Sequence, residues 1–139
     1  MLRRDGLVPA RFLSIMSHLT LCLTLLMARE DNVEACLPFE YSPDEFGAKD
    51  TQLVVGLSLA IALMLFELLG FFLGISMFMP TAAMTSILCH SSASVALAFL
   101  VFHMWDCDLY WLILALCSVP PALVELVIVI GVGGLKRGW

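Results

Sequence analysis

Residues 68–105 decide the fold, and they read LLGFFLGISMFMPTAAMTSILCHSSASVALAFLVFHMW, without one formal charge. A membrane-spanning helix needs about 20 apolar residues to cross a hydrocarbon core about 30 Å thick. This stretch is too long for one such helix and must turn. Proline removes a helical hydrogen-bond donor and disfavours helix in the residue before it, so Pro80 is the expected break. The stretch therefore predicts a helical hairpin in a membrane.

The composition agrees with a membrane environment. Hydrophobic residues make up 61% of the 139 residues and charged residues 14%, whereas soluble domains have about 45–50% apolar and about 25% charged residues. These values exclude an ordinary soluble domain and a disordered chain. With 7 basic against 12 acidic residues, nucleic-acid binding is not expected. Five cysteines are too few for a disulfide-framework protein.

Charged residues divide the chain into four apolar segments. We expect an all-α membrane protein, a four-transmembrane-helix bundle forming a single domain over residues 1–139. Its loops on the outer side would cover residues 29–52 and 105–108. The expected spans are approximately Leu7–Ala28, Leu53–Met79, Thr81–Met104 and Leu109–Leu135.

The distribution of basic residues predicts the orientation. Basic residues near span ends favour the cytoplasmic side. Five of them lie at the start of the first span or after the end of the last span, against two in the long loop, so we expect both termini to be cytoplasmic. The five are Arg3, Arg4, Arg11, Lys136 and Arg137, and the two are Arg29 and Lys49.

The long outer loop contains a helix start signal and a cysteine. Ser42, Pro43 and Glu45 match a capping box with proline at the first helical position, which predicts a short helix to about Lys49. Cys36 in this loop and Cys107 in the second outer loop would both face an oxidising compartment, so a disulfide between them is plausible. Two free thiols remain the alternative. Cys22, Cys89 and Cys117 fall within spans and are expected to pack there.

Each expected span contains one ionisable residue in its cytoplasmic half: His18, Glu67, His90 and Glu125. Ionisable residues inside a membrane are costly and suggest function. One interpretation is a site for a proton, a cation or a lipid head group, and two carboxylates with two imidazoles could also ligate a metal. The other interpretation is an interhelical hydrogen-bonded layer that fixes helix register. The first interpretation leads to an alternative function, a small proton- or ion-coupled transporter or channel subunit using Glu67 and Glu125.

Gly70 and Gly74 form a G-x-x-x-G motif, which allows close approach of helix backbones. We interpret it either as a partner or dimer face or as packing within the bundle. The sequence contains no G-x-S-x-G, H-E-x-x-H, C-x-x-C or Walker motif. We therefore expect no enzymatic activity, no catalytic residues, no cofactor and no bound metal ion.

Several short strings along the chain resemble the transmembrane protein 107 family, small tetraspan proteins of the ciliary transition zone. Each string is weak alone, but the ordered set is specific and runs from about Gly6 to Arg137. The strings are residues 6–13 (GLVPARFL), 35–38 (ACLP), 50–54 (DTQLV), 76–78 (SMF), 90–97 (HSSASVAL), 110–111 (YW) and 134–136 (GLK).

The resemblance implies a location and a role that composition does not show. It implies a multi-pass membrane protein of the ciliary transition zone that helps control which membrane proteins enter the cilium. It also implies that the protein thereby supports ciliogenesis and Hedgehog signalling. The implied partners are other transition-zone membrane and coiled-coil proteins in addition to membrane lipid, and a homo-oligomer is possible. No catalytic residue carries over from the family.

Overall fold

The structure is a computed structural model that describes residues 4–103 and 109–134, and this part of the chain is helical without strands. Four helical segments are long and apolar enough to cross a membrane: Gly6–Met27, Pro43–Phe72, Pro80–Phe102 and Leu109–Gly133. The predicted four-helix membrane fold is therefore confirmed. The elements are α1 (Arg4–Met27), α2 (Arg29–Cys36), α3 (Pro43–Phe72), α4 (Pro80–His103), α5 (Leu109–Ile113), a π-helical turn (Leu114–Ser118) and α6 (Val119–Gly134).

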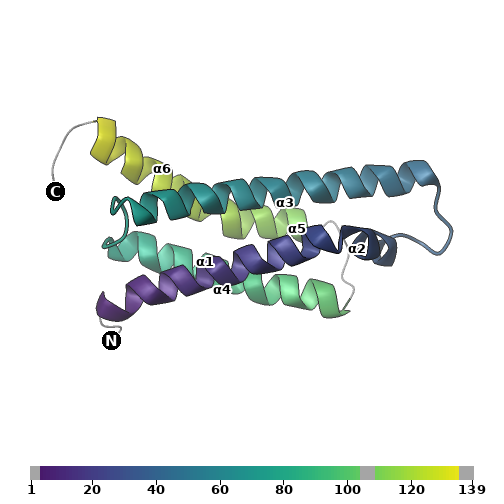
Figure 1. Ribbon diagram of the computed structural model, residues 1–139, viewed down its shortest axis with the longest axis horizontal. Helices are drawn as coiled ribbons and strands as arrows, with labels where there is room; N and C mark the ends of the chain where they lie inside the picture. Colours follow the sequence, from purple (N-terminus) through teal and green to yellow (C-terminus); the bar gives the residue numbers. More distant parts are fainter. Residues whose placement is uncertain (1–3, 104–108, 135–139) are drawn as a thin grey trace.

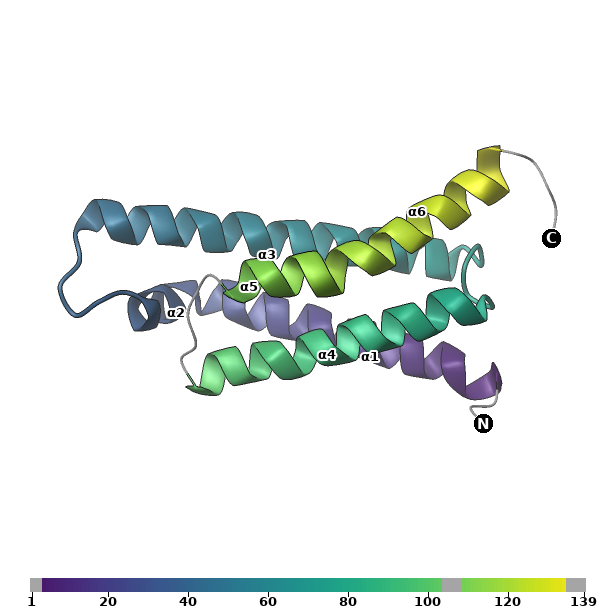
Figure 2. The same ribbon diagram turned by 180° about the vertical axis from the view of Figure 1, so that it is seen from behind.

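The four spanning segments form one bundle (Figure 1). Helix α1 packs most extensively against α4, and α3 packs against both α1 and α6. The start of α1 and the end of α6 lie at the same end of the bundle, while α2 and the start of α3 lie at the opposite end (Figures 1 and 2). This arrangement agrees with an even number of membrane crossings. The cytoplasmic orientation of that end stays a prediction.

Helix α3 begins with the predicted capping box. The Ser42 hydroxyl accepts a hydrogen bond from the Glu45 amide at 3.2 Å, and the Glu45 carboxylate accepts one from the Ser42 amide at 2.9 Å. The prediction of a separate short helix ending near Lys49 was wrong, because α3 continues without a break to Phe72. No proline or strained residue interrupts it. Thirty helical residues extend about 45 Å, so the first turns of α3 project beyond a hydrocarbon core of about 30 Å.

We expect Ser42→Ala to destabilise the first turn of α3 by about 1 kcal/mol, because the Glu45 amide loses its side-chain acceptor. Hydrogen–deuterium exchange of residues 43–48 in the full chain measures this loss as faster exchange. Thr51→Ala is the control, because the Thr51 hydroxyl only donates to the Gly47 carbonyl within the same helix. Equal exchange in the two variants would contradict the role assigned to the cap.

Helix α3 ends at Phe72, seven residues before the predicted Met79. Gly74 adopts a φ of +77°, a left-handed conformation that glycine adopts without strain. The Gly74 amide donates to the Phe71 carbonyl and the Ile75 amide to the Gly70 carbonyl, both at 3.1 Å. This pattern is the Schellman motif that closes many helices. Pro80 then starts α4, so the proline marks the next helix start rather than the helix end.

The fourth span is not a uniform α-helix. It passes from α5 through the π-helical turn into α6, where the Val119 amide donates to the Leu114 carbonyl five residues earlier. Pro120 and Pro121 follow immediately and cannot donate to the preceding turn. A π-turn is a frequent local solution where regular helix bonding fails. Beyond it, Ala122 and Glu125 face the bundle interior.

The bundle interior is narrow and its exterior is strongly apolar. Helix α3 buries residues at intervals of three or four, including Leu53, Leu57 and Met64, as expected for one face of a helix. At Gly56 an added Cβ would overlap the Tyr110 ring, so glycine permits close contact between α3 and α5. Many large apolar side chains point outward, which suits a lipid environment; they include Leu69, Phe72, Leu88, Phe102, Leu116 and Val127.

Candidate functional site: a buried ionic cluster

The structure brings the four predicted intramembrane residues, His18, Glu67, His90 and Glu125, into one cluster around Arg11. They come from four different segments: Arg11 and His18 from α1, Glu67 from α3, His90 from α4 and Glu125 from α6. Arg11 and His18 are seven residues apart, or about two helical turns, so they share the face of α1 that points into the bundle.

Arg11 lies at the centre of this cluster. Its Nη2 is 3.1 Å from Glu67 Oε1 and 3.1 Å from Glu125 Oε2. Its Nη1 donates to the Ser76 carbonyl at 3.0 Å and to the Ser76 hydroxyl at 3.1 Å. The guanidinium carbon also lies 5.3 Å from the centre of the Phe71 ring, a cation–π distance. One guanidinium therefore joins α1 to α3, to α6 and to the turn between α3 and α4.

A histidine pair continues the cluster toward the end of the bundle where α2 lies. His90 Nε2 lies 2.7 Å from Glu67 Oε2, and His90 Nδ1 lies 2.8 Å from His18 Nδ1. The Ser86 hydroxyl donates to Glu67 Oε1. The Glu67 carboxylate thus contacts Arg11, Ser86 and His90, and it connects the guanidinium to the histidine pair.

All members of the cluster are shielded from the surroundings of the bundle. Arg11, His18 and Glu67 are each 1% exposed, and His90 and Glu125 are 0% exposed. Among the described residues, two buried atoms of the cluster have no hydrogen-bond partner, Arg11 Nε and Glu125 Oε1. Charges with so little exposure are tolerated only when paired, and the Arg11 contacts provide that pairing.

The cluster can fix the register of the helices. Removing one partner of a buried ion pair costs about 3–5 kcal/mol, because the remaining charge is left uncompensated. If one of the four segments shifted by one residue in the helix packing, its ionisable side chain would rotate by about 100° around the helix axis. That side chain would then point away from the other members of the cluster. The cluster therefore disfavours any other helix register.

The cluster does not resemble a metal site. In residues 4–103 and 109–134, no group of three or more His, Cys, Asp or Glu side chains is placed to hold a metal ion. The Arg11 guanidinium occupies the position between the two carboxylates where a cation would bind. The cavity beside His18 measures about 10 Å³.

The two glycines of the G-x-x-x-G motif do not lie on one helix face. Gly70 is buried in α3, where an added Cβ would overlap Glu125 Oε1. Gly74 lies beyond the end of α3, where an added Cβ would meet nothing within 4 Å. Gly70 therefore packs within the bundle, which is one of the two interpretations of the motif, whereas Gly74 lies outside α3 and does not share a helix face with Gly70. Gly70 instead allows Glu125 to approach α3 closely enough to reach Arg11.

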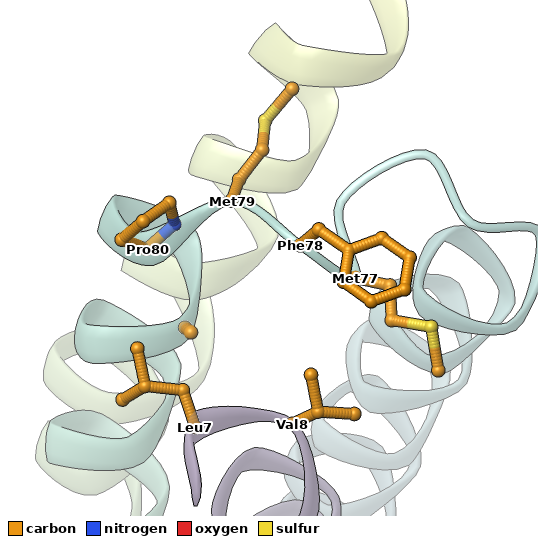
Figure 3. A pocket seen from close by; sticks show the side chains of 7 residues that line it. Leu7, Val8, Met77, Phe78, Met79 and Pro80 are labelled. Carbon is orange, nitrogen blue, oxygen red and sulfur yellow. The ribbon is translucent and has the colours of Figure 1, made fainter. Parts of the chain in front are cut away.

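A small apolar pocket lies at the end of the bundle where α1 starts (Figure 3). It measures about 280 Å³. Leu7 and Val8 of α1 line one side, and the residues from Met77 to Pro80 line the other (Figure 3). Leu7 is one helical turn from Arg11, and Met77 follows Ser76, so the pocket adjoins the Arg11 end of the cluster.

Comparison with known proteins decides the family. The family model TMEM107, described as a transmembrane protein, matches residues 7–129. The chain belongs to the transmembrane protein 107 family. Transmembrane protein 107 from Rattus norvegicus is 47% identical over 135 residues, covering 97% of this chain and 96% of that protein. The protein from Homo sapiens is 45% identical with the same coverage. The protein from Danio rerio is 48% identical over 121 residues, covering 87% and 90%.

No solved structure matches this transmembrane protein 107 family member. The family name confirms the resemblance found in the sequence strings and agrees with a multi-pass membrane protein. The names of these relatives indicate no enzymatic activity.

Arg11 is the residue of this transmembrane protein 107 family member that sequence reasoning misplaced. We counted it among the residues that set orientation, whereas it is buried inside α1 and paired with two carboxylates. The remaining flanking basic residues still outnumber those in the long loop by four to two. The available signal was the seven-residue spacing between Arg11 and His18, which places both on one helix face.

The cysteines divide into two groups. Cys22, Cys89 and Cys117 are free thiols within the spans, and Cys22 is buried. Cys36 is disulfide-bonded. Its predicted partner, Cys107, lies outside the described residues, so this pairing stays a prediction.

Proposed function

We propose that this protein is a non-enzymatic, multi-pass membrane component of the ciliary transition zone. In this role it recruits partners and controls the membrane protein composition of the cilium, and thereby supports ciliogenesis and Hedgehog signalling. The observation that carries the proposal is membership of the transmembrane protein 107 family over residues 7–129.

The architecture is compatible with a scaffold whose partners bind in the membrane. Most of the described chain lies in the four spanning segments, and the long outer loop connects only α1 to α3. The ionic cluster is enclosed within the bundle, so it stabilises the fold without facing a partner. The apolar outer faces of the helices remain for contacts with lipid and with membrane-embedded partners. Coiled-coil partners would bind outside the bilayer.

Localisation tests this proposal. A C-terminally tagged full-length chain is expressed in ciliated cells with markers for the basal body and the axoneme. We expect a tight band between the two markers. Protease digestion of the tag on intact microsomes, whose cytoplasmic face is outward, checks that the C-terminus lies on the cytoplasmic side as predicted. A diffuse plasma-membrane or endomembrane signal from a normally inserted chain would contradict the transition-zone role.

A further inference from the structure

The formal charges at the centre of the buried cluster do not cancel. Arg11 supplies one positive charge, while Glu67 and Glu125 supply two negative charges. Leaving one net charge in a low-dielectric interior costs several kcal/mol. The other titratable side chains near the cluster in the described part of the chain are His18, His90, the Cys22 and Cys89 thiols and the Tyr110 phenol. Ordinary thiols and phenols are protonated and neutral near neutral pH, so only the histidines are available to supply the missing positive charge.

The hydrogen-bond geometry restricts where an added proton can reside. A bond between His90 Nε2 and an ionised Glu67 requires a proton on Nε2, because a carboxylate only accepts. The contact between the two Nδ1 atoms of His18 and His90 requires one proton on one of these nitrogens. If a singly protonated His18 provides it, His90 is neutral and the cluster keeps one negative charge. A doubly protonated His18 would also cancel the charges, but of the two rings it is His90 that contacts a carboxylate directly, so a positive charge on His90 is better stabilised. If His90 provides it, both His90 nitrogens are protonated and the charges cancel.

We propose that His90 holds an additional proton and is an imidazolium that donates to both Glu67 and His18. The cluster of Arg11, Glu67, Glu125 and His90 is then electrically neutral within the bilayer. The 2.7 Å separation of His90 Nε2 and Glu67 Oε2 falls in the range of charge-assisted hydrogen bonds. His18 accepts with its Nδ1 and remains neutral. This inference concerns the buried cluster alone and does not depend on the ciliary role.

Glu125 is the competing position for the same proton. Its Oε2 accepts from Arg11, which stabilises the carboxylate form, and its Oε1 has no hydrogen-bond partner. A proton placed on Oε1 would be a buried donor without an acceptor, which is unfavourable. A proton on His90 instead has an acceptor on each ring nitrogen. The geometry therefore favours His90.

Nitrogen-15 NMR of the full chain in lipid nanodiscs, with labelled histidine at neutral pH, tests the proposal directly. The chain has three histidines, and their signals are assigned with His18→Gln, His90→Gln and His103→Gln. We expect both His90 nitrogens to be protonated and His18 to have one protonated nitrogen. A His90 ring with a single protonated nitrogen would overturn the proposal. An infrared carboxylic-acid band that disappears in Glu125→Gln would place the proton on Glu125 and also overturn it.

A charge-compensation pair gives an independent test. His90→Gln removes the proposed positive charge and leaves the cluster with one negative charge, so we expect a clear drop in Tm in the same nanodiscs. Adding Glu125→Gln restores neutrality and should recover most of that drop. If His90→Gln alone does not fold, the readout is the yield of folded monomer obtained from the double variant. His103→Gln, at the end of α4, is the matched control. If the Tm of the double variant were no higher than that of His90→Gln, the proposal would be contradicted.

Discussion

Replacing Arg11 with methionine should lower the free energy of unfolding in lipid nanodiscs by about 3–5 kcal/mol. Methionine occupies a similar volume but leaves Glu67 and Glu125 buried without their shared cation. It also removes the donors to Ser76 that hold the turn between α3 and α4. Unfolding by a denaturant, followed by tryptophan fluorescence, measures the change.

The matched control for this prediction is Arg29→Met. Arg29 pairs with Asp50 at 3.2 Å, but its side chain is 45% exposed, and exposed ion pairs contribute about 0–1 kcal/mol. Adding Glu125→Gln to Arg11→Met should recover part of the loss, because it removes the charge left uncompensated while Glu67 keeps its contact with His90. Equal stability losses for Arg11→Met and Arg29→Met would contradict the central role of Arg11.

Overpacking of a core alone costs about 1–3 kcal/mol. We expect Gly70→Ala to lower the free energy of unfolding of the bundle by more than this amount. The added methyl group would overlap Glu125 Oε1. The Glu125 carboxylate can move away only by leaving Arg11, so the steric cost is added to a broken ion pair. The same denaturant unfolding measures this effect.

Gly131→Ala is the control for Gly70→Ala, because an added Cβ at Gly131 meets nothing within 4 Å. Alanine is favoured over glycine in a helix by about 1 kcal/mol, so this variant should be neutral or slightly more stable. If Gly70→Ala behaved in the same way, the close approach of Glu125 to α3 would be irrelevant to stability.

The number of spans and their approximate limits were predictable because long apolar runs have few structural solutions in a membrane. The end of α3 was not predicted correctly, because Pro80 was the expected break and Gly74 was interpreted as part of the G-x-x-x-G motif. Backbone conformation decided between them: Gly74 closes α3 and Pro80 opens α4. The fusion of the capped helix at Ser42 with the second span was also missed, because charged residues at positions 44–50 suggested a separate element.

The residues of the ionic cluster were predictable as a set, but their partners were not. Depth along each helix placed His18, Glu67, His90 and Glu125 in the same half of the membrane. Which side chain faces which depends on helix rotation and on contacts between residues as far apart as Arg11 and Glu125, separated by 114 positions. Arg11 was misplaced because a basic residue near the start of a span has two roles in membrane proteins, orienting the chain or pairing within the bundle.

The position of Arg11 in the first helix has a consequence for biosynthesis. Its carboxylate partners, Glu67 and Glu125, are 56 and 114 residues further along the chain. At about 5–20 residues per second, about 3–11 s of translation separate Arg11 from Glu67. During that interval α1, whose mean hydropathy of 1.5 is the lowest of the four spans, carries an unpaired charge that opposes entry into lipid. We therefore expect stable insertion of α1 to follow the synthesis of α3, with the two helices entering the bilayer as a pair.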